Sequence, residues 1–178
     1  MGLVVFLDVK DAILNRHSVR SFSAKAPSAD VISEIIKYAH LAPSAGNLQA
    51  RDFIIVDDID IKKELSRAAL NQEFIVEAPV NIIVCANLDR ISPYGTRGRE
   101  LYCLQDAAAA VEHILLMAVE NGLGTCWVGA FNEKEVSKIL NLPSHIRPVA
   151  IIPIGYPKEK PTLTSRIDIK KLIHYNTW

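Results

Sequence analysis

A short segment near the N-terminus combines fixed positive charge with hydrogen-bond donors. Arg16-His17-Ser18-Val19-Arg20 places two guanidinium groups and a hydroxyl within five residues, where a predicted helix ends. An arginine presents a planar fork of N–H donors that matches the oxygens of a phosphate. The segment predicts a phosphate site, although two arginines four residues apart are also compatible with a solvated surface.

A second candidate is the turn 42–49, Ala-Pro-Ser-Ala-Gly-Asn-Leu-Gln. Pro43 stops the preceding helix, and Gly46 tolerates a positive φ. Ser44 and Asn47 carry short side chains that both donate and accept hydrogen bonds. Such a turn suits recognition of the polar edge of a planar heterocycle, and taken alone it also fits an ordinary helix-to-strand connection.

A third candidate, Gly129-Ala130, offers small residues where a flat ligand can approach the backbone closely. Gly122-Leu123-Gly124 is not a dinucleotide fingerprint, because these glycines follow a predicted helix and precede a strand. The sequence also lacks a P-loop, a Ser-His-Asp arrangement and metal-ligand spacing of its histidines. The sequence thus has segments suited to binding an anion and a planar ring, but no evident catalytic nucleophile. This combination indicates that a bound cofactor carries the chemistry. We expect no metal site.

These candidates are separated by segments whose apolar spacing predicts helices and strands. Asp8 is the expected cap of a first helix, and Pro27-Ser28 opens a second one that Pro43 ends. The expected strands are 53–56, 80–86, 125–128 and 149–154, and the further helices are 62–70, 100–121 and one capped by Asn132 that ends at Leu140. Their alternation predicts a layered α/β or α+β fold, with both faces of the sheet covered because the strands 53–56 and 80–86 do not alternate in polarity.

Residues 87–99 form the longest stretch without helical or strand periodicity. They contain Pro93, two glycines and three arginines, which is typical of an irregular connection. We interpret them as a mobile active-site loop, with a solvated connector as the alternative.

Composition and charge restrict the class of protein. A chain of 178 residues, 49% of them apolar, buries a full core and fits a single domain over residues 1–178. Twenty basic and twenty acidic residues leave no net field for nucleic acid or an anionic membrane surface. The long apolar region from Leu101 to Val119 contains Asp106 and Glu112, so it indicates a buried helix and not a membrane span.

The cysteines and the N-terminus indicate a cytoplasmic protein. Cys85, Cys103 and Cys126 are widely spaced in apolar runs, which predicts buried free thiols in a reducing compartment. The apolar stretch 3–7 is too short for a signal peptide. The tail 158–178 is too sparse in apolar residues to form a core of its own, so its apolar side chains need cover from another surface, such as a partner subunit.

Taken in order, the motifs resemble the nitroreductase family of FMN-dependent enzymes over almost the whole chain. The matching pieces are Arg16 to Phe22, Ala42 to Gln49, Glu77-Ala78-Pro79-Val80, Gly122 to Phe131, Pro153-Ile154-Gly155-Tyr156-Pro157, and Arg166. The resemblance implies an α+β fold, a three-layer α-β-α sandwich with a mixed, mainly antiparallel central sheet. It also implies a homodimer with FMN at the interface and a C-terminal extension, residues 158–178, that lies on the partner subunit.

The resemblance also assigns the site residues. Arg16, Ser18 and Arg20 are expected to hold the FMN phosphate and ribityl chain, with His17 adding contacts and Arg166 approaching the phosphate. Gly129 and Ala130 are expected beside N5 of the flavin ring, where a backbone N–H stabilises the reduced ring. The flavin contacts from the turn are Pro43, Ser44 and Asn47, of which the first two come from the other subunit.

This chain departs from the family's pattern at two of these positions. His17 stands where a second arginine is common, which removes one fixed charge. Gly129 stands where many relatives carry an acidic residue, so substrate preference is more affected than flavin binding.

The implied mechanism is ping-pong. NADH or NADPH transfers a hydride to flavin N5 and leaves, and a nitroaromatic, a quinone or a similar small acceptor then occupies the same slot. Tyr94 and Arg97 are hypothesised to line that slot. The alternatives are a flavin-binding protein without NAD(P)H turnover and a specialised relative with dehalogenating or flavin-fragmenting chemistry.

Overall fold

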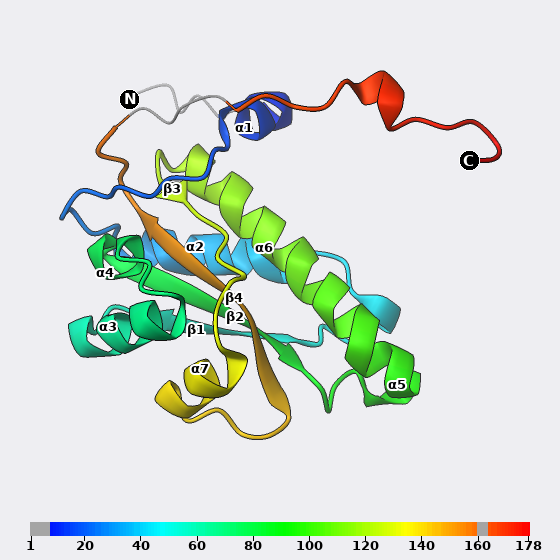
Figure 1. Cartoon of the computed structure of the whole chain (residues 1–178), viewed down its shortest axis with the longest axis horizontal. Helices are drawn as coiled ribbons and strands as arrows, with labels where there is room; N and C mark the ends of the chain where they lie inside the picture. The colour runs from blue at the N-terminus through cyan, green and yellow to red at the C-terminus, as the bar shows by residue number, and fades with distance from the viewer. Residues whose placement is uncertain (1–7, 160–163) are drawn as a thin grey trace.

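A central antiparallel sheet organises the chain (Figure 1). The computed structural model describes residues 8–159 and 164–178. In spatial order, the sheet consists of β1 (Arg51–Val56), β2 (Val80–Asn87), β4 (Ile146–Gly155) and β3 (Gly124–Thr125). All three strand pairings are antiparallel, and the parallel contact among the described residues is a single bridge between Ser18 and Thr125. The expected mainly antiparallel sheet is confirmed.

Helices cover both faces of this sheet. On one face lie α2 (Ala29–His40) and α6 (Cys103–Glu120), and on the other lie α3 (Ile59–Ala68), α4 (Phe74–Glu77) and α7 (Glu133–Ile139). Along β2, Ile82 and Val84 pack toward the first face, whereas Ile83 and Cys85 pack toward the second. Every residue of β2 is buried, which is why the strand has no polar alternation. The three-layer α+β fold is therefore confirmed.

Capping residues determine where most helices begin. Asp8 accepts from the backbone N–H of Lys10 at the start of α1 (Val9–Asn15), and the Ser28 hydroxyl caps α2. The helix expected from residue 62 begins earlier, because Asp58 accepts from the N–H groups of Asp60 and Ile61. The single-turn helix α4 was not predicted.

The segment 87–99 differs from its prediction. It forms a 3₁₀ turn (Ser92–Tyr94), the short helix α5 (Gly95–Arg97) and a π-helical turn (Gly98–Tyr102) that runs into α6. Ile91 is fully buried, and a Cβ at Gly98 would lie 2.8 Å from the Ile91 carbonyl oxygen. Close packing of this kind orders a sequence that has no periodicity of its own, so the prediction of an irregular loop was wrong.

The segment Ser92–Glu120 is one helical stretch that is long and apolar enough to cross a membrane by length and composition. Here α6 packs against α2 and the sheet, and the buried Asp106 carboxylate accepts from the backbone N–H of Ala45 at 2.9 Å. Its apolar composition is explained by this core position. Gly122 follows the helix with φ 67°, as expected for the C′ position.

The strand expected at 125–128 is shorter than predicted. Only Gly124–Thr125 pairs as β3, and Val128 returns to β4 through a single bridge to Ile151. The segment between them stays beside β4 in the same register, since the Cys126 N–H donates to the Pro153 carbonyl at 3.3 Å. Pro153 has no N–H to donate in return, so the ladder is interrupted there.

The three cysteines are buried and free, as the sequence predicts. Burial, assisted by the negative charge of Asp52, raises the pKa of Cys85 from 9.0 to about 12. The folded state thus favours the neutral thiol, so this contribution to stability is complete below pH 9 and is lost as the pH rises toward 12. We expect chemical denaturation to show that the wild type loses stability above pH 9 relative to Cys85→Val. Parallel stability curves for the two proteins would contradict this.

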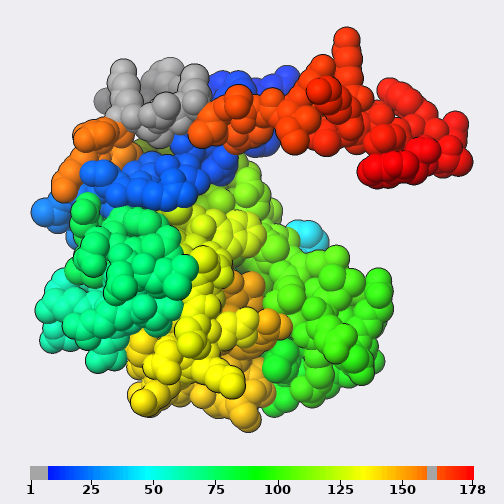
Figure 2. Space-filling model, viewed as in Figure 1, coloured from blue at the N-terminus to red at the C-terminus, as the bar shows by residue number. Residues whose placement is uncertain are grey.

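The C-terminal tail leaves the body of the molecule. Residues 164–178 extend beyond it, coloured red in Figure 2, with a single 3₁₀ turn at Ile169–Lys171. Large apolar side chains are exposed along it, namely Ile167, Ile169, Leu172, Ile173, Tyr175 and Trp178. An exposed apolar series of this kind needs cover from another surface.

Candidate functional site

The arginine segment, Arg16–Arg20, is fixed to β3. The Val19 backbone N–H donates to the Thr125 carbonyl at 2.8 Å, and the Val19 side chain is buried. A Cβ at Gly124 would lie only 2.6 Å from Val19 Cγ2, so glycine is needed for this close approach. The small residue at 124 and the apolar anchor at 19 therefore set the position of the arginines.

Ser18 and Arg20 are exposed residues that flank the buried Val19. Burial raises the pKa of Cys126, and the positive charge of nearby Arg20 opposes that shift. Both residues therefore lie beside this thiol. Arg16 is half-buried, and its backbone N–H closes α1 by donating to the Ala12 carbonyl.

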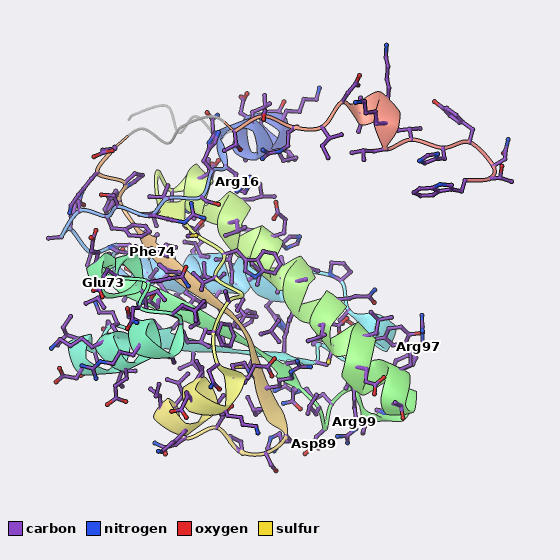
Figure 3. All side chains as sticks on the ribbon, in the orientation of Figure 1. Arg16, Glu73, Phe74, Asp89, Arg97 and Arg99 are labelled. Atoms are coloured by element: carbon purple, nitrogen blue, oxygen red, sulfur yellow. The ribbon has the colours of Figure 1, made fainter. Side chains whose placement is uncertain are left out.

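Gly129 and Ala130 lie in the same region. The Gln72 side-chain amide donates to the Ala130 carbonyl at 3.4 Å, and the next helix turn supplies Phe74, whose ring lies 5.9 Å from the Arg20 guanidinium. A Cβ at Gly129 would meet nothing within 4 Å, so open space borders this backbone. The structure thus brings the arginine segment and Gly129-Ala130 together around the turn that precedes α4, with Arg16 and Phe74 at the same end of the molecule (Figure 3).

Gln72 and Phe74 were not among the predicted site residues. Both lie in or beside α4, a single turn with no period that sequence analysis can detect. The available signal was an aromatic residue shortly before the Glu77-Ala78-Pro79-Val80 motif.

The turn 42–49 forms a second group at the other end of α6. Pro43 and Ser44 line a hollow of about 530 Å³ together with Tyr94, Tyr102, Gln105 and Asp106. The Ser44 hydroxyl accepts from the Gln49 backbone N–H at 3.0 Å, which closes the turn. Asn47 lies in the same turn, within the 3₁₀ segment Ala45–Asn47.

Tyr94 and Arg97 have different relations to this hollow. Tyr94 lines it, and its ring meets Tyr102 edge-on with the centroids 5.3 Å apart. Arg97 donates from Nε to the Tyr102 hydroxyl at 2.9 Å. Tyr94 is thus placed beside the predicted turn, whereas Arg97 is connected to the hollow through Tyr102.

Two predicted residues make their hydrogen bonds locally. Nδ1 of His17 lies 2.7 Å from the Asn15 carbonyl oxygen, and the Arg166 guanidinium donates to the Thr164 hydroxyl at 2.7 Å and to the Ser165 carbonyl. Within residues 8–159 and 164–178, no hydrogen bond or ion pair joins Arg166 to the arginine segment. Among those same residues, no three His, Cys, Asp or Glu side chains gather as a metal site.

Within one chain, the arginine segment and the turn 42–49 lie far apart. The turn contacts Asp106 near the start of α6, and the arginine segment contacts β3, which follows the end of that helix at Glu120. At 1.5 Å per residue, Asp106 and Glu120 are separated by about 21 Å. Arg16 and Arg97 accordingly lie at opposite ends of α6 in Figure 3.

Gly46 is expected to be intolerant of any side chain. Its φ is 54°, and a Cβ there would lie 2.6 Å from the Tyr94 hydroxyl oxygen. We expect Gly46→Ala to lower the free energy of unfolding by about 1–3 kcal/mol, because the backbone strain and the overlap act together. Adding Tyr94→Phe removes the closest contact and is expected to restore part of the loss in urea denaturation. A Gly46→Ala protein as stable as the wild type would contradict this packing.

Comparisons with known proteins match this fold and these motifs. The model of the nitroreductase family matches residues 13–72 and 62–156. A protein of Archaeoglobus fulgidus, whose name combines NADH dehydrogenase and NAD(P)H nitroreductase, is 36% identical over 152 residues, which are 83% of this chain and 84% of that protein. An FMN reductase (NADPH) of Bacillus subtilis is 28% identical and aligns with 94% of this chain and 73% of its own length.

Solved structures agree with the sequence matches. The NfrA1 nitroreductase of Bacillus subtilis superposes with a TM-score of 0.89 at 28% identity, covering 96% of this chain and 74% of that one. The three-layer α-β-α sandwich and the family match over residues 13–72 and 62–156 define the class of this chain as that of the nitroreductase fold. The chain is a member of the nitroreductase family.

Proposed function

We propose that this protein is an FMN-dependent oxidoreductase that uses NADH or NADPH to reduce nitroaromatics, quinones or similar small acceptors. The observation that carries the proposal is the position of Arg20 over the Phe74 ring, next to the open backbone at Gly129-Ala130 that Gln72 contacts, in a chain of the nitroreductase family. When bound, FMN supplies the redox chemistry, taking a hydride from the nucleotide and passing electrons to the acceptor. The protein binds and orients the reactants.

The residues present fit FMN. Arg16 and Arg20 supply charged donors for the phosphate, and the Ser18 hydroxyl is a donor for the phosphate or ribityl chain. Gly129 and Ala130 leave space for a flat ring to approach backbone N–H groups, which stabilise negative charge on a reduced ring. Arg166, in the tail, adds a further guanidinium for the phosphate once the tail is docked.

We infer that the site is completed by a second copy of the chain in a homodimer. The arginine segment and the turn 42–49 are separated by most of the length of α6, so one chain cannot present both groups to one cofactor. The exposed apolar side chains of the tail and of α1, where Val9 and Leu14 are 67% and 70% exposed, supply the surface that such a dimer buries.

Asn47 belongs with Pro43 and Ser44 in this arrangement. The resemblance assigned only Pro43 and Ser44 to the second subunit. All three lie in one turn closed by the Ser44–Gln49 hydrogen bond, so we assign Asn47 to that subunit as well.

Subunit mixing tests the shared site. One variant carries Arg16→Ala and Arg20→Ala, and the other carries Ser44→Ala and Asn47→Ala. In a mixed dimer, one site receives both sets of changes and the other site receives neither. After co-refolding of equal amounts, we expect about one quarter of all sites to regain wild-type activity, since about half of the dimers are mixed. Absence of any recovery, with mixed dimers present, would contradict the shared site.

Steady-state kinetics test the proposed reaction. With NAD(P)H and a quinone varied together, a ping-pong enzyme gives parallel double-reciprocal lines, because the first product leaves before the second substrate binds. Intersecting lines would indicate a ternary complex and contradict the single slot. Bound flavin without turnover would favour the flavin-binding alternative.

We also infer a cytoplasmic location. The three buried free thiols fit a reducing compartment. The balanced charge of the chain supplies no electrostatic reason for binding nucleic acid or a membrane surface. Residues 1–178 are proposed to act as one domain, with 158–178 as the extension onto the partner.

A further inference from the structure

The turn 42–49 has an unusual backbone. Gly46, Asn47 and Gln49 have φ values of 54°, 55° and 51°, all in the left-handed region. This region is costly for residues with a side chain, and it persists only where the surroundings hold it. The surroundings of this turn are therefore informative.

Arg51 holds the first part of the turn. Its side chain is buried, at 3% exposure, and it donates to the carbonyl oxygens of His40 at 2.8 Å, Ala42 at 2.6 Å and Pro43 at 3.1 Å. Burial lowers the pKa of Arg51, and the nearby negative charge of Asp106 opposes this shift. The Asp106 carboxylate accepts from the Ala45 N–H, and the Asp106 backbone carbonyl accepts from NH1 of Arg51 at 3.4 Å, so both residues contact the same turn and each other.

Arg90 holds the last part of the turn. Its NH1 group donates to the carbonyl oxygens of Gln49 at 2.9 Å and of Arg51 at 2.8 Å, while NH2 pairs with the Asp52 carboxylate. Asn87 donates to Asp52 at 2.7 Å and accepts from the Arg90 backbone N–H, which fixes this arginine in turn. The two guanidinium groups thus bind backbone carbonyls before Gly46 and from Gln49 onward, at the two ends of the left-handed stretch.

We infer that Arg51 and Arg90 are positioning residues, which hold the turn in the strained conformation that presents Ser44 and Asn47 to the cofactor. This inference rests on the proposed function for its cofactor, but the positioning itself concerns the chain alone. Arg90 precedes the segment that carries Tyr94, whose hydroxyl lies against Gly46. The segment from Arg90 to Tyr94 therefore both holds the turn, through Arg90, and lines the hollow beside it, through Tyr94.

The test compares Arg90→Met, Arg90→Lys and the matched control Arg67→Met, an exposed arginine in α3. Arg90 is chosen because its side chain is 44% exposed, so the variants are expected to fold. The first readout is amide hydrogen exchange of residues 43–51 in FMN-free protein. We expect exchange of this segment to rise about tenfold in Arg90→Met, from the loss of charge-assisted bonds, with the core strands unchanged.

The second readout is the affinity for FMN and the visible spectrum of the bound flavin at saturation. We expect Arg90→Met to bind FMN about tenfold more weakly, with a spectrum closer to that of free FMN. Arg90→Lys is expected to resemble Arg90→Met, because an ammonium group lacks the fork that reaches two carbonyls and a carboxylate. Full recovery in Arg90→Lys would overturn the requirement for that fork.

The outcomes separate this inference from the proposed function. Failure of the wild type to bind FMN overturns the proposed function, and the exchange experiment then still tests the positioning of the turn. Wild-type binding of FMN with unchanged exchange and affinity in Arg90→Met overturns the inference. A rise in exchange over the whole chain with an unchanged flavin spectrum also overturns it, because that result indicates a general loss of stability.

Discussion

Replacing both Arg16 and Arg20 with alanine is expected to weaken FMN binding by about two to four orders of magnitude. Each guanidinium is proposed to donate charge-assisted hydrogen bonds to the phosphate, and such bonds contribute roughly 1.5–3 kcal/mol apiece. Isothermal titration of FMN-free protein measures the change. The affinity of the variant should also fall less steeply with added salt, because two charges have been removed.

The control for this experiment is the double variant Arg67→Ala and Arg99→Ala. Both of these arginines are exposed, and neither lies in the arginine segment. The control variant loses the same two positive charges as Arg16→Ala with Arg20→Ala, but it leaves the proposed phosphate site intact. We expect FMN affinity to stay within a factor of about two of the wild type. Equal losses in the two double variants would show that overall charge, and not a phosphate site at Arg16–Arg20, controls binding.

Phe22→Ala is expected to produce the largest loss of stability, about 3–5 kcal/mol, through the cavity that it leaves. Phe22 is 1% exposed and packs with Val19 and Ala78. Its neighbour Ser23 donates to the Tyr156 carbonyl, which fastens the chain after the arginine segment to the end of β4. Urea denaturation monitored by circular dichroism gives the change in the free energy of unfolding.

Two further variants delimit the Phe22 effect. Phe22→Leu keeps most of the buried volume and is expected to lose clearly less stability than Phe22→Ala. Ile59→Ala removes a residue that is 47% exposed, so a change within about 0.5 kcal/mol is expected. If Phe22→Ala were no more destabilising than Ile59→Ala, the anchoring role of Phe22 would be wrong.

The parts of the fold that the sequence predicts well are those with strong local signals. Asp8, Ser28 and Asn132 mark helix starts that the structure confirms, because a short acceptor side chain satisfies free backbone N–H groups there. The buried strand 80–86 is also confirmed, with one additional residue, since its apolar run is longer than a turn and bounded by Pro79.

The parts that the sequence does not predict depend on tertiary contacts. Residues 92–102 become helical because Ile91 and Gly98 pack closely, which periodicity does not reveal. The strand expected through Val128 ends at Thr125, because its next partner on β4 is Pro153, which has no N–H for the ladder, and only a single bridge to Ile151 follows.

The site shows the same division. Its motifs were recognisable as residues that suit a phosphate and a planar ring, but their grouping was not. Gln72 reaches Ala130 from a connection without periodicity. Arg51 reaches two carbonyls of the turn just before it in sequence and a third at the end of α2. The sequence also did not reveal that the turn and the arginine segment lie at opposite ends of α6.

The most direct test of the proposed function is the visible spectrum of the purified protein through one anaerobic cycle. The protein is saturated with FMN, then NADH or NADPH is added, and then a quinone. We expect the flavin bands to bleach on addition of nucleotide and to return in full on addition of the acceptor. Flavin that stays oxidised with either nucleotide, or a protein that binds no FMN, would contradict the account.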